Sequence, residues 1–249
     1  MQKDRIKILN CPIDTFTMQE TIDKIDKSIQ EKKQLQHVVV NVAKLVYMQK
    51  DKELYNSVVE SDIINPDGQA VVWASKFLRQ PLPERVSGID VMQNLVELAF
   101  KKKYKIFFFG AKEEVVKSVV DKYTSLYNQD IIAGYRNGYF GKNEEENIAK
   151  EIGQSGADIL FVAISSPTKE IFLNKYKDII SIPFIMGVGG SFDVVSGKVK
   201  RAPLWMQRYG LEWFYRFLQE PRRMWKRYLY TNSVFLYLVF KEKYFVDFY

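Results

Sequence analysis

One carboxylate in this sequence stands where it could act on a ligand. Asp67 lies between Pro66 and Gly68, directly after an apolar segment, residues 62–65, that has the character of a strand. In parallel α/β sheets, ligands bind beyond the carboxyl ends of the strands, so an aspartate there could serve as a general base. The alternative is a turn aspartate that bonds its own backbone or caps a helix starting at Gln69. The residues by themselves favour this alternative.

Small and polar residues follow the other apolar segments. They are Asn41, Asn65, Gly110 to Lys112, Gly138 to Phe140, Ser165 to Glu170 and Gly187 to Asp193. Small residues let a backbone approach a ligand closely, and helix N-termini favour phosphate. Neither glycine-rich piece matches the dinucleotide-binding fingerprint Gly-x-Gly-x-x-Gly, and the sequence has no Walker A loop. The spacing therefore indicates an α/β protein that binds an anionic small molecule.

Short apolar segments alternate with amphipathic ones over most of the chain. Strands are expected at residues 5–10, 37–43, 62–65, 105–110, 131–135, 157–165 and 183–190, and helices at 69–78, 89–101 and 113–126. Thr17 and Glu20 have the spacing of a capping box that opens an earlier helix. Several strand segments are apolar without alternation, which is typical of strands covered on both faces. The pattern predicts an α/β fold with a mostly parallel, Rossmann-like sheet and helices on both faces.

Composition excludes several classes of protein. The chain has 249 residues, and its single cysteine, Cys11, cannot form an internal disulfide. A lone histidine, His37, excludes a zinc site built on several histidines. No signal peptide is visible, and no apolar run approaches the roughly 20 residues that a membrane span requires.

The charge is concentrated in the last part of the chain. Residues 198–249 carry a net charge of +7, equal to that of the whole chain, so residues 1–197 are neutral overall. Three of the four tryptophans also lie in this tail. Residues 204–243 are expected to form two or three amphipathic helices, with a new helix starting at Pro221. We therefore divide the chain into a core, residues 1–197, and a basic, aromatic-rich helical appendage, residues 198–249, which suits an anionic partner.

Five stretches carry a more specific signal. They are Asn65-Pro-Asp-Gly-Gln-Ala-Val-Val-Trp-Ala-Ser with its continuation Pro81-Leu-Pro-Glu-Arg-Val-Ser-Gly, Phe107-Phe-Phe-Gly-Ala-Lys, Arg136-Asn-Gly-Tyr-Phe, Gly187-Val-Gly-Gly-Ser-Phe-Asp, and Lys200-Arg-Ala-Pro-Leu-Trp-Met-Gln-Arg-Tyr-Gly-Leu-Glu-Trp. In this order they resemble the bacterial WecG/TagA/CpsF glycosyltransferases (glycosyltransferase family 26). The resemblance spans essentially the whole chain.

The resemblance implies an inverting glycosyltransferase that needs neither a metal nor a cofactor. It would move a sugar, N-acetylmannosamine in the best-understood members, from UDP to N-acetylglucosamine on undecaprenyl diphosphate. Such steps serve teichoic acid, capsule or exopolysaccharide synthesis. The alternative within the family is another donor, such as UDP-N-acetylmannosaminuronic acid or a UDP-hexose. Outside the family, the basic tail would also suit a nucleic-acid- or lipid-binding module. The α/β pattern would also suit a dehydrogenase, but the missing dinucleotide-binding fingerprint disfavours it.

The resemblance also assigns site residues. Asp67 matches the proposed base, which would take the proton from the acceptor hydroxyl. Arg85 matches an arginine that would contact the diphosphate or the acceptor; its plainer alternative is a salt bridge with Glu84 or Asp90. No metal ligand is implied. Substrate contacts are implied for Asn41, Asn65, Gly110, Tyr139, Lys169, Gly187, Gly189, Gly190, Asp193, Arg216, Arg222 and Arg223.

Two of these contacts have plainer alternatives. Tyr139 could stack on uracil or be a half-buried core aromatic. Asp193 could lie near the nucleotide or cap a helix.

Three positions depart from the common family pattern. Val39 stands where many members have threonine, and Ser165 and Lys169 stand where the usual motif has glycine and glutamine. A lysine offers a point charge in place of an amide that donates and accepts. The hypothesis is that Lys169 binds a phosphate or an acidic sugar, which leaves the donor sugar open.

For the appendage, the resemblance implies a seat on an anionic membrane surface. The protein would be cytoplasmic and peripheral at the inner face of the bacterial cytoplasmic membrane, without a nucleic-acid partner. The appendage would also close over the active site and deliver arginines to the diphosphate. The alternative is that its aromatic residues pack on the core, and we expect both to hold in part. A homo-oligomer is compatible with this arrangement.

Overall fold

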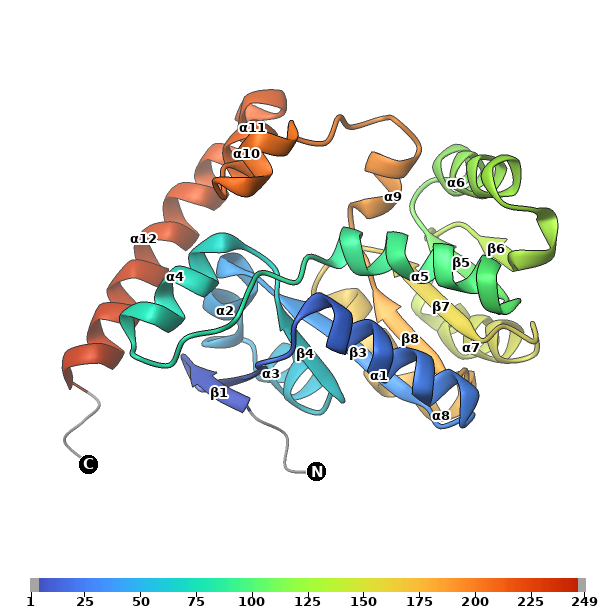
Figure 1. Cartoon of the computed structure of the whole chain (residues 1–249), viewed down its shortest axis with the longest axis horizontal. Coiled ribbons are helices and arrows are strands. Elements are labelled where there is room, and N and C mark those ends of the chain that lie inside the picture. Colours follow the sequence, from blue (N-terminus) through green and yellow to red (C-terminus); the bar gives the residue numbers. More distant parts are fainter. Residues whose placement is uncertain (1–4, 246–249) are drawn as a thin grey trace.

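A six-stranded parallel sheet forms the centre of the protein (Figure 1). The structure, a computed structural model, describes residues 5–245, except for the side chain of Arg223. The strands lie in the order β4 (Ile63–Pro66), β3 (Leu35–Val40), β8 (Phe184–Gly187), β7 (Ile159–Ala163), β5 (Ile106–Gly110) and β6 (Ile132–Arg136), and each neighbouring pair is parallel. The predicted α/β fold is confirmed.

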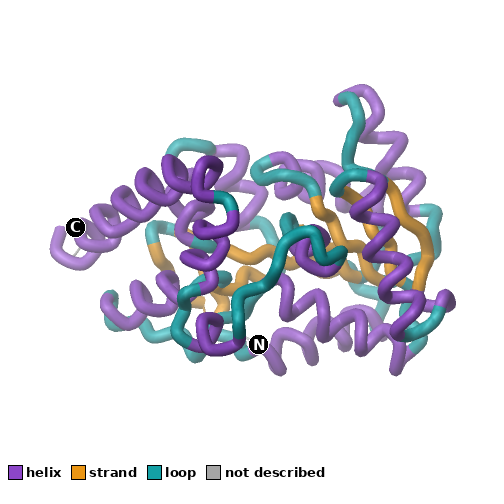
Figure 2. The backbone as a smooth tube through the Cα atoms, turned by 90° about the horizontal axis from the view of Figure 1, so that it is seen from above, coloured by secondary structure: helices purple, strands orange, loops and turns teal. Residues whose placement is uncertain are grey.

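Helices cover both faces of this sheet (Figure 2). Along β5, Ile106 and Phe108 face one core, while Phe107 and Phe109 face another. This two-residue period explains why the strands are apolar throughout. The first face packs against α1 (Met18–Gln30), α5 (Gly88–Lys102) and α6 (Glu113–Leu126). The second packs against α2 (Val42–Met48), α3 (Lys52–Val59), α4 (Gln69–Phe77), α7 (Glu145–Gly153) and α8 (Thr168–Ile180).

The helix starts show how local sequence sets these elements. The predicted capping box is confirmed at α1, where the Glu20 N–H donates to Thr17 Oγ1 and the Thr17 N–H donates to Glu20 Oε2. Residues 41–43, predicted as strand, instead begin α2, because Asn41 Oδ1 accepts a hydrogen bond from the Lys44 N–H at 3.0 Å. Two short 3-10 helices, Gln129–Ile131 and Lys142–Glu144, flank β6.

The first predicted strand lies outside the main sheet. Residues 5–10 were expected to belong to the alternating pattern, but β1 (Arg5–Ile8) pairs antiparallel with β2 (Cys11–Asp14) in a separate hairpin. Leu9 and Asn10 both have left-handed φ angles, 50° and 61°, which is the geometry of a two-residue type I′ turn. The expectation was wrong because neither residue is a glycine, so the sequence gives a weak turn signal.

The segment after α9 (Ser191–Val195) forms three helices. They are α10 (Leu204–Arg208), α11 (Glu212–Gln219) and α12 (Pro221–Phe245), and the predicted start at Pro221 is confirmed. α12 runs along the side of the molecule next to α2 and α4 (Figure 1). Its Phe235 and Val239 are buried in the core that the hairpin shares with α2, and Glu242 accepts a hydrogen bond from the Leu9 N–H.

The second half of α12 thus packs into the core of residues 1–197, as expected in part for the appendage. Of the helices within residues 5–245, none combines the length and apolar character that crossing a bilayer requires.

Candidate active site

Asp67 lies at the carboxyl edge of the sheet, directly after β4. Its N–H donates to the Val40 carbonyl at 2.7 Å, and the Pro66 carbonyl accepts from the Val86 N–H at 2.9 Å. Gly68, with a φ of +144°, precedes α4, and no side chain caps that helix. The aspartate is therefore not a helix cap. The residue is partly exposed, and within residues 5–245 its carboxylate has no hydrogen-bond or ion-pair partner.

The surroundings of Asp67 favour a proton on its carboxylate. Burial is the largest cause and raises the pKa of Asp67 above its ordinary value. Arg85 and Lys44 oppose this effect, whereas Glu212 and Asp90 add to it. An aspartate with a raised pKa is a stronger base once ionised, which is the property that general base catalysis near neutral pH requires.

Arg85 connects the core to the appendage. Its guanidinium lies 2.7 Å from Glu212 of α11 and 3.7 Å from Asp90 of α5. Arg201 contacts the same two carboxylates, at 2.6 Å to Asp90 and 3.4 Å to Glu212. We call these four residues the Arg85 cluster. Of the two ion-pair partners predicted for Arg85, Asp90 contacts it. Glu84 does not, and instead accepts a hydrogen bond from the Met18 N–H.

A second group of charges lies deeper. The Nζ atoms of Lys44 and Lys169 approach the same oxygen of Glu170, at 2.7 and 2.6 Å, and Lys44 also donates to the Val39 carbonyl at 2.6 Å. We call Lys44, Lys169 and Glu170 the lysine cluster. Burial, together with the Lys44 charge, lowers the pKa of Lys169 to about 8, although Glu170 opposes the change. The two ammonium groups lower the pKa of Glu170 to about 2 against the effect of burial.

The turn after β8 brings three of the predicted glycines to this place. The Lys169 chain crosses Gly187 so closely that a Cβ there would lie 3.0 Å from Lys169 Cδ. Gly189 has a left-handed φ of +53°. Arg216 of α11 reaches the same turn, where a Cβ on Gly190 would lie 2.9 Å from its Nη2. The Arg216 Nε is buried and has no hydrogen-bond partner among the described residues.

Asp193 lies just beyond this turn, in the first turn of α9. Its carboxylate is 3.3 Å from Lys198 Nζ, and Gly190 occupies the cap position before α9. The side chain therefore pairs with the start of the appendage and does not cap its own helix.

Gly110 and Tyr139 lie toward the other edge of the sheet. The chain after β6 turns back over β5, where the Gly138 N–H donates to the Ala111 carbonyl at 2.9 Å and a Cβ on Gly138 would lie 2.9 Å from the Gly110 Cα. Gly110 has no room for a side chain, since a Cβ would lie 2.5 Å from the Ala163 backbone. Tyr139 is 69% exposed, so it is not a half-buried core aromatic.

Several predicted contact residues have other neighbours in this structure. Asn65 is fully buried, with Oδ1 2.8 Å from His37 Nε2 and 3.3 Å from Thr21 Oγ1. Val39 is buried in the core below α5, and Ser165 is exposed. Arg222 is exposed at the start of α12. The side chain of Arg223 lies outside the part of the chain that the structure describes.

Sequence reasoning missed Lys44, Glu170, Arg201 and Glu212. Lys44 carries a signal in hindsight, because it interrupts an apolar run, Val42-Ala-Lys-Leu-Val, where a buried lysine requires a partner. The pairing of Arg201 and Glu212 with α5 and Arg85 has no such signal, because it depends on where the appendage packs.

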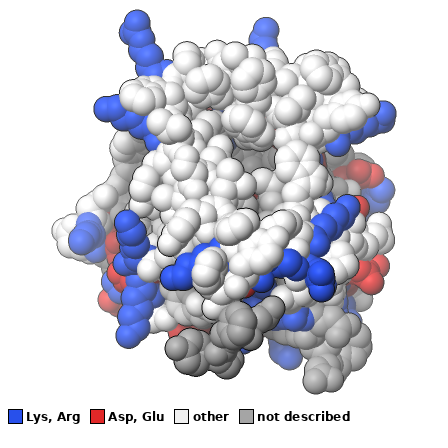
Figure 3. Space-filling model, turned by 90° about the vertical axis from the view of Figure 1, so that its left-hand side faces the viewer, with Lys and Arg blue, Asp and Glu red and all other residues white. Residues whose placement is uncertain are grey.

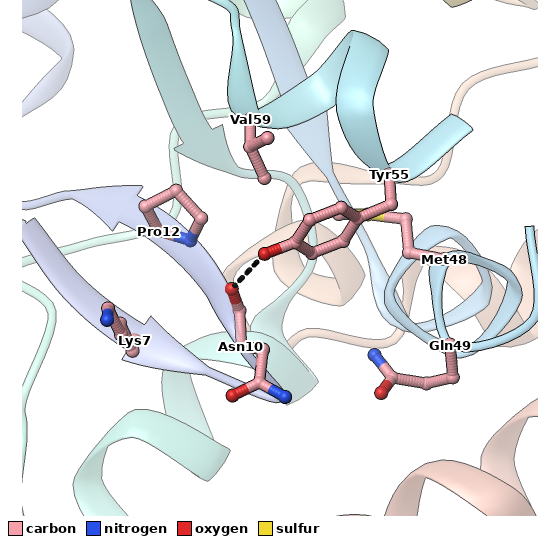
Figure 4. A pocket seen from close by; sticks show the side chains of 7 residues that line it. All are labelled: Lys7, Asn10, Pro12, Met48, Gln49, Tyr55 and Val59. Atoms are coloured by element: carbon pink, nitrogen blue, oxygen red, sulfur yellow. Dashed lines mark hydrogen bonds between the residues drawn. The ribbon is translucent and has the colours of Figure 1, made fainter. Parts of the chain in front are cut away.

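A hollow of about 440 Å³ lies away from these residues (Figure 4). It is bounded by the β1–β2 hairpin, α2 and α3, and the Tyr55 hydroxyl donates to the Asn10 carbonyl at 3.3 Å beside it. None of the residues predicted for the active site lines this hollow.

The chain belongs to the WecG/TagA/CpsF family of glycosyl transferases, whose family model matches residues 6–247. It is 42% identical over 194 residues to the N-acetylglucosaminyldiphosphoundecaprenol N-acetyl-beta-D-mannosaminyltransferase of Bacillus subtilis (strain 168), covering 78% of this chain and 75% of the relative. The protein of the same name from Bacillus spizizenii is 40% identical over 176 residues, covering 70% and 67%. The resemblance seen in the sequence and the predicted enzyme class are thereby confirmed.

Proposed function

We propose that this enzyme transfers N-acetylmannosamine from UDP to N-acetylglucosamine carried on undecaprenyl diphosphate. The names of the two Bacillus relatives support this acceptor and this sugar. The observation that carries the proposal is Asp67, a partly exposed residue with a raised pKa at the edge of the sheet where ligands bind.

In the proposed reaction, Asp67 takes the proton from an acceptor hydroxyl. The hydroxyl oxygen then forms a bond to the anomeric carbon of the donor sugar, on the face opposite to UDP. The bond between that carbon and the phosphate oxygen breaks, and UDP leaves with the electron pair. Attack from the opposite face inverts the anomeric configuration.

Cationic and N–H groups of the chain would stabilise the charge that develops on UDP. Arg216 is suited to this role because its guanidinium lies against the Gly190 turn with an unpaired Nε. Arg85 lies close enough to Asp67 to lower its pKa, and it would contact the diphosphate or the acceptor. Asn41, Gly187, Gly189, Asp193, Arg222 and Arg223 are proposed as further contacts. We propose that no metal or other cofactor takes part, so a chelator would leave the rate unchanged.

The nucleotide would lie along the carboxyl edge of the sheet. Uracil would stack on the exposed ring of Tyr139 near Gly110, with the diphosphate at the Gly187–Gly190 turn and the sugar near Asp67. This arrangement follows the order of the strands, in which β8 lies between β4 and β5. The buried position of Asn65 suits an indirect role, in which it supports the strand that ends before Asp67.

The proposal is tested by measuring UDP release with a short-chain polyprenyl-diphosphate-linked N-acetylglucosamine and a panel of UDP-sugars, in the presence of chelator. We expect turnover with UDP-N-acetylmannosamine. Turnover only with UDP-N-acetylmannosaminuronic acid or a UDP-hexose would contradict the proposed sugar and keep the reaction type. No turnover with any donor would contradict the proposal as a whole.

We also propose that the appendage holds the enzyme on an anionic membrane surface. Figure 3 shows the side that carries α12, where Lys and Arg side chains surround a broad uncharged area and lie across its lower part, and most of the visible acidic groups lie toward the edges. Leu204 and Trp205 of α10 and Leu218 of α11 are more than half exposed, at 70, 58 and 58%. Each Lys or Arg near an anionic surface contributes about 1 kcal/mol, and the apolar groups would enter the headgroup region.

Sedimentation with vesicles tests this attachment. We expect binding to vesicles that contain anionic lipid, weaker binding at high salt, and a loss of about tenfold for the double variant Leu204→Ser, Leu218→Ser. Leu126→Ser is the matched control, because Leu126 is 61% exposed but lies on α6 of the core. Equal binding by both variants, or tighter binding to RNA or DNA than to vesicles, would overturn the proposal.

A further inference from the structure

In the lysine cluster, two buried ammonium groups share one carboxylate, whereas an ordinary ion pair joins one cation and one anion. Lys44 comes from α2, while Lys169 and Glu170 are neighbours in the first turn of α8. One carboxylate oxygen serves both ammonium groups, at 2.7 and 2.6 Å, and each of the three residues is at most 7% exposed. Water therefore screens these charges poorly.

The cluster carries one positive charge in excess. Two ammonium groups face a single carboxylate, and Arg227 of α12 adds a further positive charge that lowers the pKa of Lys169. The negative charge of Asp67 offsets the excess only in part, since burial raises the pKa of that aspartate. A buried cation without full compensation is unfavourable, and a bound anion would supply the missing negative charge.

The position of Lys169 shows where that anion would bind. Its side chain runs across Gly187, and its Cε lies 3.9 Å from the place that a Cβ on Gly189 would take. The ammonium group is thus held beside the turn that faces Arg216. A larger residue at Gly187 would push the lysine away, so the glycine and the lysine fit each other.

We propose that Lys169, anchored by Glu170 and supported by Lys44, binds an anionic oxygen group of the donor. The group is either the diphosphate or the carboxylate of an acidic sugar. This inference rests on the proposed function in one respect, that the donor is a UDP-sugar.

Binding of four probes to the chain without acceptor tests the inference. They are uridine, UDP, a neutral UDP-N-acetylhexosamine and a UDP-N-acetylhexosaminuronic acid, measured by calorimetry at pH 7. Lys169→Gln removes the charge, Lys169→Arg keeps it, and Lys44→Met removes the supporting ammonium. Lys175→Gln is the matched control, since this lysine lies on the same helix but pairs with Glu145 on the surface. The melting temperature of each variant establishes that it is folded.

If Lys169 binds the diphosphate, Lys169→Gln weakens UDP and both UDP-sugars by about tenfold or more and leaves uridine unchanged. If it binds a sugar carboxylate, the same variant weakens only the acidic UDP-sugar. In both cases Lys169→Arg restores most of the affinity and Lys44→Met shows a smaller loss. Unchanged affinities for all probes in folded Lys169→Gln would overturn the inference. Failure of the unmodified chain to bind any UDP compound would instead contradict the proposed function.

A pH series separates this role from a merely structural one. Because the pKa of Lys169 is lowered to about 8, its ammonium loses its proton as the pH rises from 7 to 9. The groups facing it are Lys44 of α2, Glu170 of α8 and Arg227 of α12. We expect the affinity of the unmodified chain for the preferred UDP-sugar to fall over this range and that of Lys169→Arg to stay constant. Parallel profiles would contradict the inference.

Discussion

The Arg85 cluster and the lysine cluster both place charges near Asp67, but they do so in two different ways. In the first, two arginines meet two carboxylates, so the charges balance, and the group lies between the core and the appendage with side chains 17 to 30% exposed. In the second, two lysines meet one carboxylate inside the core. The Arg85 cluster, whose charges balance, holds the core and the appendage together. The lysine cluster has one excess positive charge, which we propose binds a ligand.

The difference also determines how each cluster acts on Asp67. The Arg85 cluster has opposing effects, because Arg85 lowers the pKa of the aspartate while Glu212 and Asp90 raise it. From the lysine cluster, Lys44 lowers it. The appendage therefore contributes, through Glu212, to the basicity of a residue in the core.

The largest effect is expected at Asp67, whose pKa responds to charges from both clusters. Asp67→Asn should lower kcat/KM by about 10² to 10⁴, since an amide cannot accept the proton. The same change should raise the melting temperature at pH 7, because the pKa of Asp67 is raised in the folded state and its ionised form opposes folding. Steady-state kinetics and thermal unfolding measure the two effects. A variant that is inactive and also less stable would show that the aspartate is structural.

Glu170→Gln removes the only negative charge of the lysine cluster. We expect a loss of about 3 kcal/mol in the free energy of unfolding, since two buried ammonium groups then face each other. The pKa of Glu170 is lowered to about 2, so its stabilisation is complete above pH 4.5 and is lost as the pH falls toward 2. The variant should lack this acid-dependent loss in denaturant titrations. Glu146→Gln, which breaks an exposed pair with Lys150, should leave stability unchanged.

Glu212→Gln unbalances the Arg85 cluster at small energetic cost. The pair is partly exposed, so we expect a loss in unfolding free energy below about 1 kcal/mol. Removing the negative charge should lower the pKa of Asp67, and the acidic limb of the kcat/KM profile should move to lower pH. A profile that stays in place would mean that Asp67 and the appendage are not electrostatically coupled during catalysis.

The sequence predicted much of this fold because the strands are apolar on both faces and the motifs fall at their ends. It also placed Asp67 at the edge of the sheet. It missed the β1–β2 hairpin, whose turn uses Leu9 and Asn10 in left-handed geometry. It also extended the strand predicted at residues 37–43 into α2, because apolar residues continue past Asn41.

The charge clusters were beyond sequence reasoning for a physical reason. Each joins residues more than a hundred positions apart, such as Lys44 with Glu170 and Arg85 with Glu212. Their pairing depends on strand order and on where the appendage packs, and neither leaves a local pattern. Lys169 was identified because it departs from the family pattern, whereas the only signal of Lys44 is that it interrupts an apolar run.

The contact between Glu242 and Leu9 joins two segments that the ribosome makes at very different times. The hairpin and α2 are made well before Phe235 and Val239, which cover their apolar side chains. Domains generally begin to fold during synthesis, from the N-terminal end. One part of the core therefore stays open until the second half of α12 has been made, and a nascent chain that is released before then exposes the apolar surface that chaperones bind.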